Sequence, residues 1–259
     1  MIRSNSLKNG LKQGKSYIGT FAKIPDPSVV EIFALSGFDY FVIDNEHSQM
    51  SKESMVNLLR ASDISGIVPI VRVRENSRAQ ILQALDAGGL GVMVPETSTA
   101  AAVKHVVDSA LYAPEGARGY TASSRAAGYG NMNASEYAKV ANENVMVVVY
   151  CETMEAIENI DAMLAVPGVD VMWLGPMDLS QALGVTGQPK HPLVLKTMDS
   201  IIAKSKKAGV AVGTIAPDVE TTKDLLRRGV QLIALSSDQA MLGYAGRTFM
   251  KGVRESGLL

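Results

Sequence analysis

The regular alternation of short apolar segments with helical patterns is the feature of this sequence that most restricts its fold. Eight segments rich in β-branched residues are candidate strands: Tyr17–Phe21, Asp39–Ile43, Val68–Val73, Gly91–Val94, Val145–Cys151, Val171–Leu174, Val210–Thr214 and Gln231–Leu235. The helical patterns between them are Pro27–Ser36, Lys52–Ser62, Ser77–Ala87, Ser98–Tyr112, Met154–Ala165, His191–Lys207, Val219–Arg228 and a last stretch from Gln239. Such alternation is typical of right-handed βαβ units around a parallel sheet.

Eight strand–helix units within 259 residues match a (β/α)8 barrel. A doubly wound open sheet is the alternative fold, and it should carry a glycine-rich phosphate-binding turn after its first strand. The segment Phe21–Asp26 contains no glycine, and Gly89-Leu-Gly91 runs into a strand instead of a helix. We therefore predict an α/β fold of the (β/α)8 TIM barrel type. No linker, charge run or low-complexity tract interrupts the chain, which predicts one domain over residues 1–259.

Two segments outside the alternation need their own interpretation. Met1–Lys15 carries four basic residues and no acidic one, and we predict a short solvated helix there. Ala113–Ala134 is a long connection that contains several glycines, arginines and tyrosines. Loops of this length in compact domains are usually functional or disordered. A packed surface excursion and a lid are therefore both open interpretations of this loop.

The overall composition excludes several classes of protein. The 25 basic and 26 acidic side chains nearly cancel, which argues against a nucleic-acid-binding surface. No apolar run reaches the roughly 18 residues of a membrane span, and the N-terminus lacks the apolar core of a signal peptide. The one cysteine excludes an internal disulfide and a cysteine-based zinc site, and it fits a reducing compartment. We expect a cytoplasmic protein with no nucleic-acid or membrane partner.

Polar side chains cluster directly after the predicted strands. Barrel enzymes place their chemistry at this end of the strands, on the loops that lead into the helices. The candidates at these positions are Asp44, Asn45, Glu46, His47, Arg72, Arg74, Glu96, Glu152, Asp178, Ser236, Ser237 and Asp238. Acidic groups, a histidine and an arginine are thus predicted to face one mouth of the barrel.

The residue types at this mouth indicate a chemistry. Two carboxylates on adjacent strands, with no cysteine, suit a hard divalent cation such as Mg²⁺ or Mn²⁺. Arg72 would stabilise an oxyanion opposite the cation, and His47, next to acidic residues, is a general base for neutral pH. Structural roles remain open for each: Asp178 as a helix cap, Glu152 at a helix N-terminus, Arg72 in an ion pair. A Schiff-base route would need a lysine at a strand exit, and only Lys23 lies near one.

At these residues the chain resembles the metal-dependent, class II pyruvate aldolases of the HpcH/HpaI family. The matching segments run in family order: Phe38–His47, Pro69–Arg72, Tyr112–Gly119, Glu152–Thr153, Gly168–Asp170, Leu174–Ser180 and Gly184–Pro189. Two positions depart from the pattern. Close relatives commonly carry glutamine where this chain has Tyr150, and a small residue where it has Met177. By this resemblance, both departures would change the pocket that binds the substrate.

The resemblance implies an aldehyde-lyase that cleaves a 4-hydroxy-2-oxo acid to pyruvate, or a close oxo acid, and an aldehyde. Glu152 and Asp178 resemble the family's ligands of a divalent cation, which is Mg²⁺, Mn²⁺ or Co²⁺. Arg72 resembles the arginine that holds the pyruvyl oxygens and stabilises the enolate. His47, with Asp44, resembles the base system that takes the proton of the C4 hydroxyl.

The same resemblance implies further contacts and an assembly. Glu46 resembles an acid that supports the metal site, and Asp86 matches a position that a neighbouring subunit supplies in relatives. Family members are usually hexameric, so we expect a homo-oligomer.

Two other functions remain open: a lyase of CoA thioesters, like the citrate lyase β-subunit and malyl-CoA enzymes, and a non-catalytic barrel that binds an oxo acid. The residues expected to bind the substrate are Arg72, Tyr150, Gly175, Pro176, Met177 and Ile215.

Overall fold

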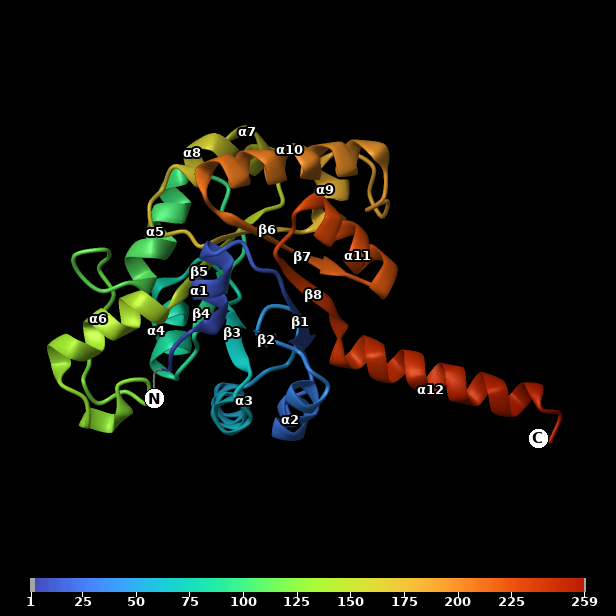
Figure 1. Cartoon of the computed structure of the whole chain (residues 1–259), viewed down its shortest axis with the longest axis horizontal. Coiled ribbons are helices and arrows are strands. Elements are labelled where there is room, and N and C mark those ends of the chain that lie inside the picture. Colours follow the sequence, from blue (N-terminus) through green and yellow to red (C-terminus); the bar gives the residue numbers. More distant parts are fainter. Residues whose placement is uncertain (1–2, 259) are drawn as a thin grey trace.

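The computed structural model describes residues 3–258, and its centre is a closed barrel of parallel strands (Figure 1). Each strand pairs with the next one in sequence, and the eighth closes the barrel on the first. The predicted (β/α)8 barrel is therefore confirmed. The strands are β1 (Tyr17–Ala22), β2 (Tyr40–Asp44), β3 (Val68–Arg72), β4 (Gly91–Val94), β5 (Met146–Cys151), β6 (Val171–Leu174), β7 (Ala211–Ala216) and β8 (Leu232–Ser237).

The helices follow the predicted order with three differences. A helix after the long loop, α6 (Ala134–Asn144), and a short helix in a strand exit, α9 (Pro176–Ala182), were not predicted. The predicted helix Met154–Ala165 is two helices, α7 (Met154–Glu158) and α8 (Ile160–Leu164), which meet at Asn159. The other helices are α1 (Ser6–Lys12), α2 (Pro27–Leu35), α3 (Lys52–Ser65), α4 (Arg78–Asp86), α5 (Ala100–Ala110), α10 (Pro192–Ala208), α11 (Val219–Arg228) and α12 (Asp238–Glu255).

Two apolar layers form the core, one on each face of the strands. Side chains alternate between the faces of a strand, so Tyr40, Val42 and Trp173 fill the barrel while Phe41 and Ile43 pack beneath the helices. Every residue of β2 to β6 is buried. This double burial explains why these strands read as continuous apolar runs.

The N-terminal helix α1 is not solvated, so that part of the prediction was wrong. Leu7 is completely buried and belongs to the cluster that fills the barrel. Lys8 is also buried, because its ammonium donates to the carbonyl oxygen of Val145 (2.6 Å) and pairs with Asp170 (3.2 Å). Asn5 donates through Nδ2 to the carbonyl of Leu90 (2.9 Å). Helix α1 therefore closes the N-terminal end of the barrel, a role that its basic composition concealed.

Truncation of Leu7 measures how much this closure stabilises the fold. We expect Leu7→Ala to lower the free energy of unfolding by about 2–5 kcal/mol, since it opens a cavity in a filled core. Lys12→Ala, on the exposed face of the same helix, should change it by less than about 0.5 kcal/mol. Urea unfolding followed by circular dichroism gives both values. Equal effects of the two changes would show that α1 does not stabilise the barrel.

The long connection before α6 is a packed excursion and does not cover the strand exits of its own barrel. It joins the end of α5 to α6, which leads directly into β5, so it lies at the N-terminal end of the strands. Arg118 pairs with Asp86 at the end of α4 (2.6 Å) and lies over the ring of Tyr112. Arg125 pairs with Asp63 on α3. These ion pairs hold the loop against the ends of two helices.

The last helix, α12, begins against β1 and β8 and then leaves the barrel (Figure 1). Of its 18 residues only Asp238, the first, is buried. The wall beside it is less well covered than the rest of the barrel, because Ile18 on β1 and Leu235 on β8 are only half-buried. Within residues 3–258, no helix combines the length and the apolar character that crossing a bilayer requires.

Candidate active site

An arginine–aspartate pair lies at the exits of β2 and β3. Asp44 and Arg72 are the last residues of these strands and are partners in the sheet register. Arg72 Nε donates to Asp44 Oδ1 (3.1 Å) and Arg72 Nη2 to Asp44 Oδ2 (2.7 Å), while Nη1 lies 2.9 Å from Glu46 Oε2. Only 8% of Arg72 is exposed. Two parallel hydrogen bonds to one carboxylate fix a guanidinium in orientation as well as position.

Asp44 also shapes the loop that carries the histidine. Its Oδ1 accepts hydrogen bonds from the backbone amides of Glu46 (3.1 Å) and His47 (2.9 Å). Burial acts to raise the pKa of Asp44, but the hydrogen bonds and charge of Arg72 outweigh it and hold this pKa below its usual value. Asp44 therefore remains ionised and stabilises both the turn and the guanidinium.

The imidazole of His47 is exposed at the mouth of the site. Its side chain is 65% exposed, and Nε2 lies 3.7 Å from Glu46 Oε2. The carboxylate of Asp44 bonds to the backbone of His47, whereas Glu46 is the acid near the ring. The structure thus brings together Asp44, His47 and Arg72, and it places Glu46 between the ring and the guanidinium.

Two carboxylates converge over Gly175. A Cβ at Gly175 would lie 2.7 Å from Asp178 Oδ2 and 3.4 Å from Glu152 Oε2, so both carboxylates face this glycine and a side chain there would crowd Asp178. Burial raises the pKa of Glu152 to about 7; the amide of Glu96, which donates to Oε1 (3.1 Å), lowers it, and nearby Asp178 raises it further. Like charges held this close are stabilised by a cation between them. The pair therefore fits the predicted divalent ion.

Asp178 does not cap a helix, whereas Glu152 lies directly before the N-cap residue of α7, at the N-terminus of that helix. Asp178 lies in the first turn of α9, whose N-cap is Gly175, and no side chain caps that helix. Glu152 precedes Thr153, whose hydroxyl caps α7 by accepting from Ala156 N. Among residues 3–258, no three His, Cys, Asp or Glu side chains lie close enough to enclose an ion. Two carboxylates would leave positions open for water and substrate, as Mg²⁺ sites commonly do.

Aromatic residues form the floor of the site beneath Arg72. Tyr150 is buried; its hydroxyl accepts from Arg72 Nη1 (3.3 Å) and donates to Met93 Sδ (3.2 Å). Burial raises the pKa of Tyr150 well above its usual value, so the hydroxyl keeps its proton. Trp173 packs between Tyr150 and Phe21. The tyrosine that departs from the family pattern thus supports the guanidinium directly.

Two adjoining cavities form the mouth. The smaller, of about 210 Å³, is lined by Phe21, Lys23, His47, Arg72, Tyr150, Trp173, Gly175, Asp178, Ile215 and Ser237. The larger, of about 500 Å³, is lined by Glu46, His47, Arg72, Glu96, Glu152, Thr153, Met154, Asp178, Gln181 and Ala182. Most of the predicted site residues therefore lie around one mouth.

Several predicted residues lie elsewhere, and several lining residues were missed. Pro176 and Met177 line a separate apolar groove of about 680 Å³ between α10 and α11, which Ile215 also borders. Asp86 lies at the opposite end of the barrel in its pair with Arg118. Phe21, Lys23, Trp173 and Ser237 line the smaller cavity but were not predicted to bind substrate. The inward alternation of strand residues was the signal that could have identified Phe21 and Lys23.

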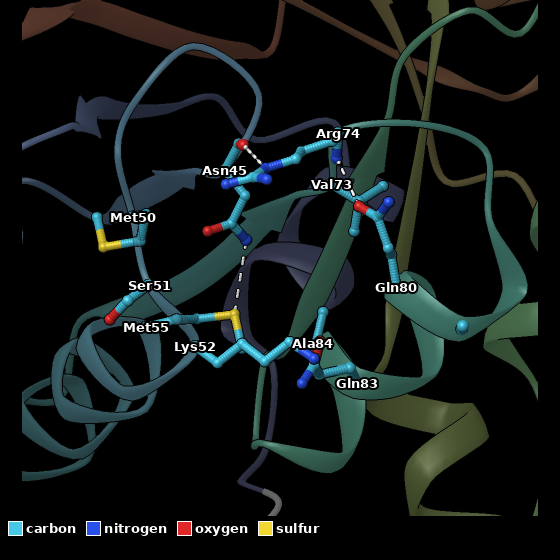
Figure 2. A pocket seen from close by; sticks show the side chains of 11 residues that line it. Asn45, Met50, Ser51, Lys52, Met55, Val73, Arg74, Gln80, Gln83 and Ala84 are labelled. Carbon is cyan, nitrogen blue, oxygen red and sulfur yellow. Dashed lines mark hydrogen bonds between the residues drawn. The ribbon is translucent and has the colours of Figure 1, made fainter.

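A third cavity, of about 610 Å³, lies outside the mouth between the loop after β2 and α4 (Figure 2). Arg74 borders it and is held in the loops: its Nε donates to the carbonyl of Asn45 (2.8 Å), and its amide donates to Gln80 Oε1 (3.0 Å). Asn45 Nδ2 in turn lies 3.6 Å from Met55 Sδ. Neither carboxylate over Gly175 lines this cavity, so we assign the chemistry to the mouth.

An ordered guanidinium beside paired carboxylates at the mouth of a parallel barrel is an arrangement that can stabilise negative charge on oxygen. The chain belongs to the HpcH/HpaI aldolase/citrate lyase family, whose sequence model matches residues 17–244. It is thus an aldolase, an enzyme of the aldehyde-lyase class. The resemblance inferred from the motifs is confirmed.

Individual relatives cover nearly the whole chain. The 2-keto-3-deoxy-L-rhamnonate aldolase of Salmonella gallinarum is 35% identical over 238 residues, which cover 92% of this chain and 88% of the relative. The 2-dehydro-3,6-dideoxy-6-sulfogluconate aldolase of Pseudomonas putida is 34% identical over 232 residues, 90% of each chain. A crystal structure of a family protein from Burkholderia cenocepacia superposes with a TM-score of 0.92 at 32% identity, covering 97% of this chain and 100% of that one.

Proposed function

We propose that this protein is a divalent-metal-dependent aldolase that cleaves a 4-hydroxy-2-oxo acid to pyruvate, or a close oxo acid, and an aldehyde. The observation that carries the proposal is the convergence of Glu152 and Asp178 over Gly175, next to the cavity into which Arg72 is fixed. Glu152 and Asp178 would hold Mg²⁺, Mn²⁺ or Co²⁺. A bound cation of this kind supplies Lewis acidity to an oxo group.

The chain's own residues supply the remaining steps. Arg72 would hold the oxygen that becomes negative when the C3–C4 bond breaks. Burial acts to lower the pKa of Arg72, but Tyr150, Asp44 and Glu46 raise it above its usual value, so its charge is permanent. His47 would take the proton of the C4 hydroxyl, directly or through water, and its exposed ring lets that proton pass to solvent.

Exchange of the methyl protons of pyruvate for deuterium tests this function without any choice of aldehyde. We expect NMR to show exchange that requires Mg²⁺, Mn²⁺ or Co²⁺, because enolate formation is the shared half of cleavage and condensation. Absence of exchange with all three ions in folded protein would contradict the proposal. Cleavage of a CoA thioester without action on free oxo acids would identify the CoA lyase instead. Pyruvate binding with neither exchange nor cleavage would identify a binding barrel.

We also propose that the protein is a homo-oligomer, a hexamer by resemblance, in which α12 packs on a second copy. Large apolar side chains on this helix are exposed: Leu242, Tyr244, Phe249, Met250 and Val253. Monomeric proteins rarely expose a continuous apolar surface of this kind. The half-covered wall of β1 and β8 lies at the base of the same helix, so two copies can exchange helices reciprocally.

Charge placed on this helix should break the assembly. We expect the double change Leu242→Glu and Phe249→Glu to reduce the oligomer to smaller species in size-exclusion chromatography with light scattering, because buried carboxylates without partners are costly. Lys251→Ala, which removes an exposed charged side chain from the same helix, should leave the mass of the oligomer unchanged. A monomeric wild type at micromolar concentration would refute the assembly.

A further inference from the structure

The smaller cavity of the mouth differs in charge from the larger one. Glu46, Glu96, Glu152 and Asp178 line the larger cavity, where Arg72 is the one Arg or Lys among the lining residues. The smaller cavity has two fixed cations, Lys23 and Arg72, and one acid, Asp178, at its border with the larger one. Away from that border its walls are aromatic or aliphatic apart from Lys23, His47 and Ser237. Lys23 and Arg72 thus give the β1 side of the mouth cationic donors for an anionic group, whereas acids line the larger cavity.

The ammonium of Lys23 keeps hydrogen-bond donors that its contact with Asp44 does not occupy. Lys23 Nζ lies 3.3 Å from Asp44 Oδ2, whereas Arg72 Nη2 lies 2.7 Å from the same oxygen and Arg72 Nε bonds to the other. Arg72 therefore makes the closer contacts with Asp44, and its Nη1 also pairs with Glu46. An ammonium has three donors, and this contact occupies at most one. The remaining donors lie at the lining of the smaller cavity, where the Lys23 side chain is 25% exposed.

The backbone at Lys23 is fixed from the opposite end of the sequence. Asp238, buried at the start of α12, accepts from the amides of Lys23 (2.8 Å) and Ile24 (2.7 Å) through Oδ2. The carboxylate thus ties the loop after β1 to the end of β8. A long side chain on a fixed backbone can contact a ligand at a defined position without any rearrangement of the loop.

We propose that Lys23 is a specificity-determining residue that selects 4-hydroxy-2-oxo acids whose C4 substituent carries a second anionic group. This inference rests on the proposed function, because His47 marks where the C4 hydroxyl lies. Lys23 and His47 line the same smaller cavity, so a C4 substituent that enters this cavity meets the ammonium. A carboxylate, a sulfonate or a phosphate shares the required charge.

Condensation of pyruvate with matched aldehydes tests the selectivity. Glyoxylate and glycolaldehyde differ mainly in charge, and glyceraldehyde 3-phosphate with glyceraldehyde gives a phosphate pair. We expect the wild type to prefer the anionic member of at least one pair, and the favoured pair distinguishes carboxylate from phosphate. Lys23→Met should reduce kcat/KM for that anion about 10–100-fold, mostly through KM, since one charge-assisted hydrogen bond is lost. Lys23→Arg should restore most of the preference, and exposed Lys15→Met should not alter it.

Each aldehyde rate is divided by the same variant's rate of pyruvate proton exchange. A lysine that served only to neutralise Asp44 would change exchange and both condensations in proportion, leaving the ratio of anionic to neutral aldehyde constant. A constant ratio, or a wild type that prefers neutral aldehydes in both pairs, overturns the inference while the proposed function stands. A wild type that neither exchanges pyruvate protons nor condenses any aldehyde overturns the proposed function itself.

Discussion

Replacing Arg72 with alanine should slow both pyruvate proton exchange and cleavage by about 10²–10³-fold, the loss seen when one donor to a developing oxyanion is removed. The guanidinium is held by two hydrogen bonds to Asp44 and borders the cavity beside the acid pair. Its interaction with substrate strengthens as the oxygen gains charge, so the loss should fall on kcat more than on KM.

The stability of the variant needs a separate measurement, because Asp44 is fully buried. Removing its main partner should lower the free energy of unfolding by about 3–5 kcal/mol, although the amides of Glu46 and His47 remain bonded to the carboxylate. Arg72→Lys keeps a charge but not the two parallel bonds, and it should recover stability more than rate. Rates within threefold of wild type in a folded Arg72→Ala protein would show that the guanidinium does not stabilise the enolate.

Removing the divalent cation should have a still larger effect. Lewis-acid stabilisation contributes several kcal/mol, so we expect EDTA to lower exchange and cleavage by more than about 10³-fold, and added Mg²⁺ or Mn²⁺ to restore them. Asp178→Asn should prevent that restoration, because one of the two carboxylates over Gly175 loses its charge. Calorimetric titration with Mn²⁺ should show the same loss as weaker binding, independently of any activity.

The matched control is Glu155→Gln, which removes an exposed carboxylate from α7, three residues beyond Glu152. It should leave Mn²⁺ affinity and activity within twofold of wild type. Full activity in protein stripped of metal would contradict the proposed mechanism. Unchanged Mn²⁺ affinity in Asp178→Asn would show that the cation binds elsewhere.

Predictions about strands and their exits succeeded because they depend on local pattern. The apolar segment before Asp44 and the one before Arg72 each predicted a strand that ends within one residue of the observed end. A parallel barrel then requires that all such ends meet at one mouth. The strand-exit positions of Glu152, Asp178 and Arg72 were predicted in this way, and their roles were proposed from the family resemblance.

Predictions about burial failed where a distant part of the chain supplies the partner. Lys8 has the composition of a solvated helix, but Asp170 and the carbonyl of Val145 receive its ammonium inside the protein. Lys23 was considered only for Schiff-base chemistry. Its position in the mouth depends on Asp238, which is 215 residues away in sequence. Neither partner can be inferred from spacing along the chain.

The sequence alone determined the eightfold alternation, the barrel that follows from it, and the residue types at the strand exits, because each of these depends on neighbours within a few positions. Only the tertiary structure decided that Asp44 holds Arg72 by two bonds, that Glu152 and Asp178 converge over Gly175, and that α12 leaves the barrel. These features depend on strand register and on contacts between distant segments. A shift of one residue in register reverses which side chains face the barrel interior.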